Sequence, residues 1–526
     1  MTTVREVTYD LLRALGMTTV FGNPGSTEAP FLRDFPADFR YVLSLQEAST
    51  VAMADGFAQA TGRPALVNLH TAPGVGNAMG NIIAAWHNKT PLVVTAGQQT
   101  RAMMAMEPWL YNRDAVDLPK PYVKWSSEPP RAEDVPAAVE RAFHTAMQQP
   151  RGPVFLSIPM DDWDAPAEPR TPRTVSDRTA PDPTALHRVA DLLGTSKRSA
   201  IIAGAEIDRS DGWEEAVALA ERTRAAVYSA PVTERVGFPE GHPLFQGPLP
   251  FAQKPISDTL SGYDVVLVVG APVFRYYPHV PGPATPEGTR LLHLTDDPDE
   301  AARAVAGDAV VGDVRLALER LLQLVPASDR AAPTARPRPA PPPARAPIGP
   351  AFLAHALAQA LPSDAVIAAE SPTNAPALRD YLRPSRPGGY YSAASGGLGW
   401  ALPAAVGLQL AHPERRVVAV VGDGSSLYSI QALWTAAQLN LPLVVIVPNN
   451  AQYAILKAFT RFQDTSGVPG LDLPGLDIAG IARGFGYDAH RVDRPEDLAG
   501  ALRDALAACA PVLVEVVVDP AIPPLI

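Results

Sequence analysis

Short apolar runs, many of them rich in β-branched residues, alternate along this chain with longer segments of helical periodicity. The runs most typical of buried strands lie at residues 65–69, 92–95, 154–158, 200–203, 265–269, 417–421 and 443–447. Several lead directly into glycine, and a strand followed by a glycine-containing turn and a helix is typical of parallel sheets. The pattern therefore predicts an α/β protein whose mainly parallel sheets are flanked by helices.

Two proline-rich stretches, near residues 164–183 and at 331–350, interrupt this alternation. Three consecutive prolines in the second stretch cannot continue a helix or a central strand. Because a chain of 526 residues is too long for one hydrophobic core, we expect several domains. The predicted organisation is an N-terminal domain (1–165), a central Rossmann-like domain (184–330), a linker (331–350) and a C-terminal domain (351–526).

Composition excludes several classes of function. The net charge is −11 and no run of lysine and arginine stands out, so we expect no nucleic-acid partner. No uncharged apolar run is long enough for a membrane span, and the N-terminus does not resemble a signal peptide. The single cysteine, Cys509, excludes an intrachain disulfide framework and fits a reducing compartment. We therefore expect a cytoplasmic protein without a membrane partner.

Two strand ends in the last third of the chain carry short oxygen-bearing side chains. Residues 417–421 lead into Gly422-Asp423-Gly424-Ser425, and the next predicted strand ends at Asn449-Asn450. Glycines let the backbone approach an anion, and a helix N-terminus favours phosphate oxygens. Asp423 and Asn450 offer the hard oxygen ligands that Mg²⁺ prefers. A tight turn beside an unrelated asparagine pair would explain the glycine motif alone, but the pairing of both strand ends favours a metal and diphosphate site.

Three successive strand ends in the first third carry Ser26, Glu47 and His70. A lone glutamate at a helix start usually interacts with the helix dipole, and a lone histidine at a strand end is usually structural or solvated. Their common position at the carboxyl edge of one sheet favours a site instead. A partly desolvated carboxyl group can share its proton with a bound group, and Glu47 is the candidate for this role.

Together, the Gly-Asp-Gly-Ser and Asn-Asn segments resemble the thiamine-diphosphate signature of the superfamily of acetolactate synthase and pyruvate decarboxylase. Further segments resemble benzoylformate decarboxylase, and the resemblance extends over nearly the whole chain. These segments lie at residues 21–26, 45–48, 68–70, 76–80, 96–103, 161–164, 396–399 and 432–438. The resemblance implies a carboxy-lyase that uses thiamine diphosphate and Mg²⁺, which Ca²⁺ could replace.

Residue roles follow from the resemblance position by position. Asp423 and Asn450 would bind the metal through their side chains, and Gln452 through its main-chain carbonyl. Glu47 would contact the aminopyrimidine ring, Ser26 the substrate carboxylate, and His70 would handle protons. The remaining cofactor contacts would come from Thr373, Leu398, Gly424, Ser425 and Tyr453.

The sequence departs from the benzoylformate decarboxylase pattern in three places. Tyr277 stands where the family has a histidine that would protonate the intermediate left after CO₂ loss. His279 lies two residues later, on the same side of an extended chain, and is the candidate replacement. In the substrate pocket, which would include Ser26, His70, Ile455 and Phe459, the family typically has a small residue at the Ile455 position. Pro372 replaces a hydroxyl residue, so Thr373 would serve near the diphosphate.

The predicted function is decarboxylation of a 2-keto acid to an aldehyde and CO₂, with benzoylformate as the preferred substrate. Alternatives are a smaller aliphatic keto acid, a carboligating or lyase relative that acts on acyloin- or acetolactate-type carbon–carbon bonds, and a non-catalytic cofactor-binding protein. The turns at Gly204 and Gly270 carry no dinucleotide fingerprint, so no FAD is expected. The family also implies at least a homodimer, commonly a homotetramer, with active sites at subunit interfaces.

Overall fold

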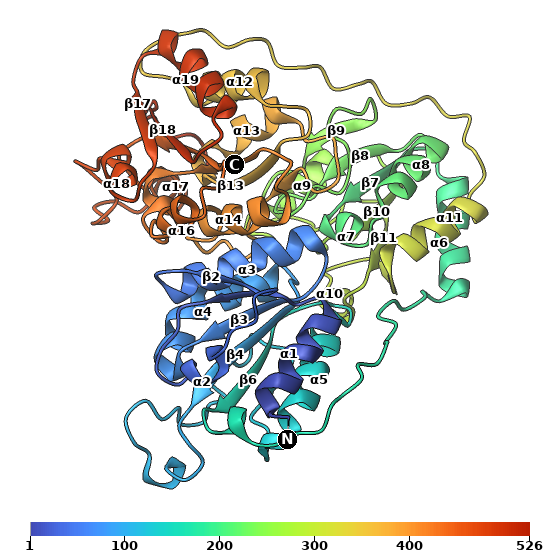
Figure 1. The fold of residues 1–526 in the computed structure, drawn as a ribbon. Helices are drawn as coiled ribbons and strands as arrows, with labels where there is room; N and C mark the ends of the chain where they lie inside the picture. The colour runs from blue at the N-terminus through green and yellow to red at the C-terminus, as the bar shows by residue number, and fades with distance from the viewer. Residues whose placement is uncertain (1) are drawn as a thin grey trace.

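The computed structural model describes residues 2–526 and contains three sheets of six strands each, all of them parallel (Figure 1). The N-terminal domain lies below the other two in this view, with the central domain to the right and the C-terminal domain to the left. This confirms the predicted fold class. Within residues 2–526, no helix combines the length and the apolarity that crossing a membrane requires.

The first sheet has the strand order β2-β1-β3-β4-β6-β5. Its strands are β1 (Thr19–Gly22), β2 (Arg40–Leu43), β3 (Ala65–Leu69), β4 (Leu92–Gln98), β5 (Ser126–Ser127) and β6 (Val154–Pro159), and its helices are α1 (Val4–Leu15), α2 (Ala29–Leu32), α3 (Glu47–Thr61), α4 (Thr71–His87) and α5 (Val135–Met147). Alternate strand residues face two separate apolar clusters, so helices cover both faces of the sheet.

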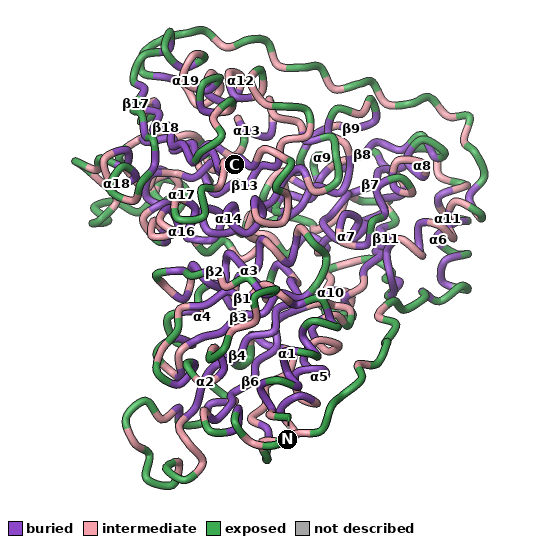
Figure 2. Tube along the Cα trace, in the orientation of Figure 1, coloured by how far each residue is buried: buried purple, intermediate pink, exposed green. Residues whose placement is uncertain are grey.

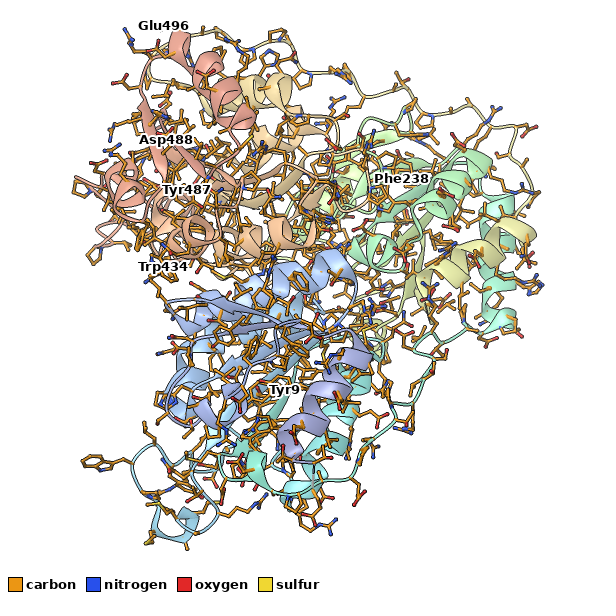
Figure 3. All side chains as sticks on the ribbon, viewed as in Figure 1. Tyr9, Phe238, Trp434, Tyr487, Asp488 and Glu496 are labelled. Carbon is orange, nitrogen blue, oxygen red and sulfur yellow. The ribbon has the colours of Figure 1, made fainter. Side chains whose placement is uncertain are left out.

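The central sheet has the order β12-β11-β10-β7-β8-β9. Its strands are β7 (Ser199–Ala203), β8 (Ala226–Ser229), β9 (Phe245–Pro248), β10 (Val265–Val269), β11 (Arg290–Thr295) and β12 (Asp308–Val311), and its helices are α6 (Pro183–Thr195), α7 (Ala205–Arg209), α8 (Trp213–Thr223), α9 (Gln253–Thr259), α10 (Pro298–Ala302) and α11 (Val314–Leu324). Tyr9 and Phe238 mark the buried interiors of the N-terminal and central domains (Figure 3).

The third sheet has the order β14-β13-β15-β16-β18-β17. Its strands are β13 (Val366–Glu370), β14 (Tyr390–Tyr391), β15 (Val417–Val421), β16 (Val444–Asn449), β17 (Asp488–Val492) and β18 (Val512–Val517). Its helices are α12 (Pro350–Ala360), α13 (Ala375–Leu382), α14 (Ala401–Ala411), α15 (Asp423–Ser426), α16 (Ala432–Gln438), α17 (Ala454–Phe462), α18 (Ile478–Gly484) and α19 (Pro495–Ala507). Residues 331–345 form no helix or strand and run as an exposed tube from the central domain to α12 (Figure 2).

The helical segment that follows Gly422 is interrupted. The turns at residues 427–431 divide it into α15 and α16. The Ser426 hydroxyl donates to the Asp423 carbonyl oxygen at 2.7 Å, a local bond that competes with continuation of the helix. The interruption leaves Tyr428 exposed at the cavity described below.

Packing of α3 against α14 joins the N-terminal and C-terminal domains of the chain. A methyl group at Gly56 would overlap the Ala404 carbonyl oxygen, so glycine is needed for the two backbones to approach. The Trp400 indole also donates to the buried Asp55 carboxylate at 2.8 Å. Residues of both domains form one continuous apolar cluster, which fixes the two sheets relative to each other.

Candidate active site

The ends of β15 and β16 meet at the carboxyl edge of the third sheet. The two strands pair in parallel, with Val420 opposite Ile446. Asp423, which begins α15, is buried, and its Oδ2 accepts the main-chain N–H of Ala451 at 2.8 Å. Ala451 has a φ of 57°, a left-handed conformation that is uncommon for alanine and that folds the turn back over Asp423. The structure thus brings Asp423 and Asn450 to one place, as the sequence predicted.

The oxygen atoms at this edge suit a hard cation. Burial raises the pKa of Asp423, although hydrogen bonds from main-chain N–H groups oppose this shift. A cation bound beside the carboxylate would favour its ionised form. The Gln452 side chain is engaged with the Lys457 ammonium at 2.7 Å and with the Pro520 carbonyl at 2.6 Å, which leaves its main-chain carbonyl as the predicted ligand. Within residues 2–526 no group of three or more His, Cys, Asp or Glu side chains could hold a metal ion, so a metal here would need amide and main-chain oxygens beside the Asp423 carboxylate.

A cavity of about 760 Å³ lies between the C-terminal domain and the central domain. One wall carries predicted cofactor and pocket residues, and the other carries the turns at Gly204 and Gly270, directly after β7 and β10. The predicted residues that line it are Thr373, Leu398, Tyr453, Ile455 and Phe459. Gly424 lies behind this wall, where a methyl group would come within 2.5 Å of the Tyr453 ring.

Glu370 holds the loop that follows Leu398. Its carboxylate, at the end of β13, accepts N–H groups from Gly399 at 2.6 Å and from Trp400 and Ala401 at 2.8 Å each. Burial raises the pKa of Glu370 to about 7, although these three N–H groups oppose the shift. Sequence reasoning missed this residue. Its position at a strand end before Ser371-Pro372-Thr373 was the available signal.

Two asparagine amides orient Glu47 at the start of α3. The side-chain amides of Asn23 and Asn77 donate to its two carboxylate oxygens, each at 3.1 Å. The Glu47 side chain is 9% exposed, so it is partly desolvated, as a carboxyl that contacts an aminopyrimidine ring must be.

His70 follows β3 and precedes a strained residue. Thr71 has a φ of 39°, which is rare for a β-branched residue, and its buried hydroxyl has no hydrogen-bond partner. Gly25 packs directly against the His70 ring, where any side chain would overlap it. The exposed Ser26 is the next residue of that loop, so the structure brings Ser26 and His70 to the same edge of the first sheet.

The two groups of predicted residues remain separate within one chain. Among the residues that the structure describes, the lining of the 760 Å³ cavity includes none of Ser26, Glu47 and His70. His279 is also exposed and outside that lining. Tyr277 lines it instead, and its ring stacks on Phe459 with centroids 5.0 Å apart and planes at 21°.

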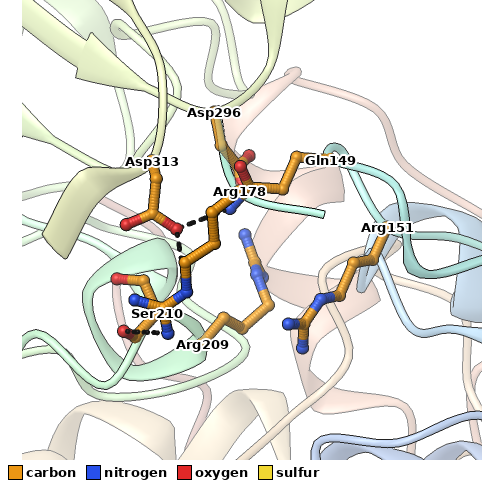
Figure 4. Close-up of a pocket in the computed structure, with 7 residues that line it drawn as sticks. All are labelled: Gln149, Arg151, Arg178, Arg209, Ser210, Asp296 and Asp313. Carbon is orange, nitrogen blue, oxygen red and sulfur yellow. Dashed lines mark hydrogen bonds and ion pairs between the residues drawn. The ribbon is translucent and has the colours of Figure 1, made fainter. Parts of the chain in front are cut away.

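A second cavity, of about 10 Å³, lies where the N-terminal domain, the first linker and the central domain meet (Figure 4). Asp313 accepts from the Gln149 amide at 2.9 Å and lies 3.7 Å from the Arg178 guanidinium. This volume holds about one water molecule. It is therefore a polar contact between domains and too small for a substrate.

Comparison with known proteins places these features in a family. Three models of thiamine pyrophosphate enzymes match the chain: the N-terminal TPP binding domain over residues 2–117, the central domain over 186–321 and the C-terminal TPP binding domain over 373–516. Benzoylformate decarboxylase of Pseudomonas aeruginosa is 48% identical over 524 residues, which cover 98% of this chain and 99% of that protein.

Solved structures agree with these matches. Benzoylformate decarboxylase from Polynucleobacter necessarius superposes with a TM-score of 0.98 at 45% identity and covers 100% of both chains. The thiamine diphosphate-dependent 4-hydroxybenzoylformate decarboxylase of Rhodococcus jostii gives 0.96 at 45% identity, covering 99% of this chain and 100% of that one.

The chain belongs to the thiamine pyrophosphate enzyme family. Within that family it groups with the 2-keto-acid decarboxylases of the benzoylformate decarboxylase type, which confirms the predicted family and enzyme class. The comparisons do not favour the carboligating or non-catalytic alternatives.

Proposed function

We propose that this enzyme decarboxylates benzoylformate or a ring-substituted relative to the corresponding aldehyde and CO₂. The observation that carries the proposal is the end-to-end identity of 48% with a benzoylformate decarboxylase. The position of Ile455 and Phe459 supports it, because both predicted pocket residues face the open space of the cavity of about 760 Å³.

The third sheet would hold the diphosphate end of the cofactor. Asp423, Asn450 and the Gln452 carbonyl would bind Mg²⁺, while Gly424, Ser425 and Thr373 would contact phosphate oxygens. Leu398 would support the cofactor from the loop that Glu370 anchors. When bound, thiamine diphosphate supplies the electron sink that lets a 2-keto acid lose CO₂.

The first sheet would supply the groups that exchange protons and bind the substrate. Glu47, fixed by Asn23 and Asn77, would hydrogen-bond N1′ of the cofactor. Ser26 would donate to the substrate carboxylate, and His70 would hold or move a proton at the substrate oxygen. His279 stays the predicted donor for product release, although the lining of the cavity includes its neighbours Tyr277 and Pro278 and not His279 itself.

These two sets of residues would meet across a subunit interface. Glu47 and Asp423 lie in different domains, and the cavity that contains the cofactor-side residues includes none of the first-sheet residues described. A loop of the N-terminal domain also exposes large apolar side chains, with Met106 67% and Trp109 94% exposed. Surfaces of this kind typically mark subunit contacts. We therefore propose at least a homodimer, commonly a homotetramer.

We also propose a cytoplasmic location, because the one cysteine of the chain, Cys509, is unpaired.

The test is CO₂ release from benzoylformate, pyruvate and a branched aliphatic 2-keto acid, measured side by side with thiamine diphosphate and Mg²⁺. We expect benzoylformate to be preferred, and omission of the cofactor or addition of a chelator to abolish release after dialysis. Preference for an aliphatic acid would contradict the substrate, and cofactor-independent release would contradict the site.

A further inference from the structure

Glu28 is a buried carboxylate directly behind His70, and nothing in the sequence pattern drew attention to it. Its side chain is 1% exposed. Oε1 accepts the Gly97 N–H at 2.9 Å and the Thr27 hydroxyl at 2.7 Å. Oε2 accepts the Gly25 N–H and faces His70 Nδ1, both at 2.9 Å. Each oxygen therefore has two donors, which suits an ionised carboxylate and no other common side chain.

Two glycines leave the space that this arrangement needs. A methyl group at Gly97, near the end of β4, would overlap Glu28 Oε1 and the Thr27 side chain. A methyl group at Gly25 would overlap the His70 ring. The close contact of the 25–28 loop, the end of β4 and the His70 ring is thus built into the backbone.

The hydrogen bonds specify which His70 nitrogen carries the proton. Nδ1 faces Glu28 Oε2 at 2.9 Å and the Thr27 hydroxyl oxygen at 3.2 Å. The one hydroxyl hydrogen of Thr27 is directed at Glu28, so both neighbours of Nδ1 act as acceptors. In neutral histidine the proton must then be on Nδ1 and the lone pair on Nε2. The His70 side chain is 20% exposed, so it reaches the open side of the site.

One further titratable side chain lies within the electrostatic influence of Glu28. Tyr41, on β2, has its pKa raised by burial and by the charge of Glu28, which keeps its phenol neutral. The Tyr41 hydroxyl is buried without a hydrogen-bond partner. A neutral phenol cannot take over the role of the carboxylate as a charged acceptor for Nδ1–H.

We propose that Glu28 is a positioning residue that fixes His70 as the Nδ1–H tautomer and so presents Nε2 to the substrate. The inference rests on the proposed role of His70 in proton handling. Glu28 itself touches neither substrate nor cofactor. It acts through His70, as carboxylates behind functional histidines do when they set ring orientation and tautomer.

The decisive variant is Glu28→Gln, because an amide NH₂ in place of one oxygen would face two donors. We expect kcat for benzoylformate to fall roughly 10- to 100-fold while KM changes much less. Nitrogen-15 NMR of histidine-labelled enzyme measures the tautomer, and the His70 signal is assigned by its absence in His70→Ala. The unmodified holoenzyme should show the Nδ1–H tautomer, and Glu28→Gln should show a shift toward the Nε2–H tautomer. Glu28→Asp keeps the charge and should preserve the tautomer.

A double-mutant cycle separates positioning from general damage. If Glu28 acts through His70, Glu28→Gln should have little further effect on kcat in a His70→Ala background. Glu140→Gln is the matched control, since it removes another buried carboxylate of the same domain, paired with Arg170, and should leave the His70 tautomer unchanged.

An Nε2–H tautomer in the unmodified enzyme would overturn the inference without any variant, and so would independent, additive effects of the two substitutions. Unchanged turnover in His70→Ala would instead remove His70 from the proposed function. In that case the tautomer measured by NMR still decides whether Glu28 orients the ring.

Discussion

Tyr277 and Phe459 join the central and C-terminal domains through one pair of stacked rings at the wall of the large cavity. Tyr277 is 65% exposed, so the ring is available to a substrate as well as to Phe459. Stacked aromatic pairs contribute about 0.5–1.5 kcal/mol beyond the area that they bury. A flat aromatic keto acid would gain from the same surface.

Replacing Tyr277 by Ala should therefore raise KM for benzoylformate about 5- to 10-fold and leave KM for pyruvate nearly unchanged, because only the aromatic substrate loses a stacking surface. Steady-state kinetics with both substrates measures this. Tyr277→Phe keeps the ring and is the control for the hydroxyl group. Equal changes with both substrates would mean that the ring does not contact the substrate.

His279 gives a separate prediction, because its side chain lies outside the cavity lining. If it donates the proton for product release, His279→Ala should slow aldehyde formation roughly 10²- to 10⁴-fold, the usual range for general acid catalysis. Stopped-flow measurement of CO₂ and aldehyde distinguishes this step from decarboxylation. Normal aldehyde release in the variant would exclude His279 as the donor.

At the scale of elements, the loop between β14 and α14 depends on one carboxylate at the end of β13. Glu370 caps three main-chain N–H groups at the N-terminus of α14, and this fixes the loop that contains Leu398. Since its folded pKa is about 7 and its ordinary value is 4.5, the folded state binds the proton more tightly than the unfolded state.

The contribution of Glu370 to stability should therefore be fully present below about pH 4.5 and should be lost as the pH rises through 7. Between pH 5 and pH 8, the difference in unfolding free energy between the unmodified enzyme and Glu370→Gln should change by roughly 3 kcal/mol in this direction. Urea titrations at several pH values measure it. Parallel curves for the two proteins would contradict the shifted pKa.

Sequence periodicity predicted the strands at these sites well, because β-branched runs such as Val417–Val421 are buried on both faces of a parallel sheet. The proximity of Asp423 and Asn450 was also predictable, since both follow the ends of two strands that pair in space. The roles of Glu28 and Glu370 could not be predicted, because their partners include main-chain N–H groups of residues distant in sequence, such as Gly97 for Glu28. The local sequence pattern does not indicate such contacts.

At the scale of the whole molecule, the main question is how Glu47 and Asp423 come to act together. The α3–α14 contact fixes the two domains within a chain, and the large cavity opens between the central and C-terminal domains. A second copy of the chain would bring its own first-sheet edge to this cavity. Closed two-fold symmetry would then form two equivalent sites.

Mixing two inactive variants tests this arrangement. Glu47→Gln and Asp423→Asn, unfolded together and refolded, should recover about a quarter of full activity, because half of the dimers are mixed and one of their two sites is intact. Each variant refolded alone is the control. If both residues act within one chain, the mixture should stay inactive, and light scattering would show whether dimers formed.

The proline-rich connection between the central and C-terminal domains has a practical consequence. Residues 331–345 belong to no sheet, while a shared apolar cluster already holds the two domains together. A break in the chain within residues 331–345 should therefore change the folded structure little. Two separately produced polypeptides, divided within this stretch, should associate into a working enzyme, which would turn its activity into a reporter of whether both halves are present in the same cell.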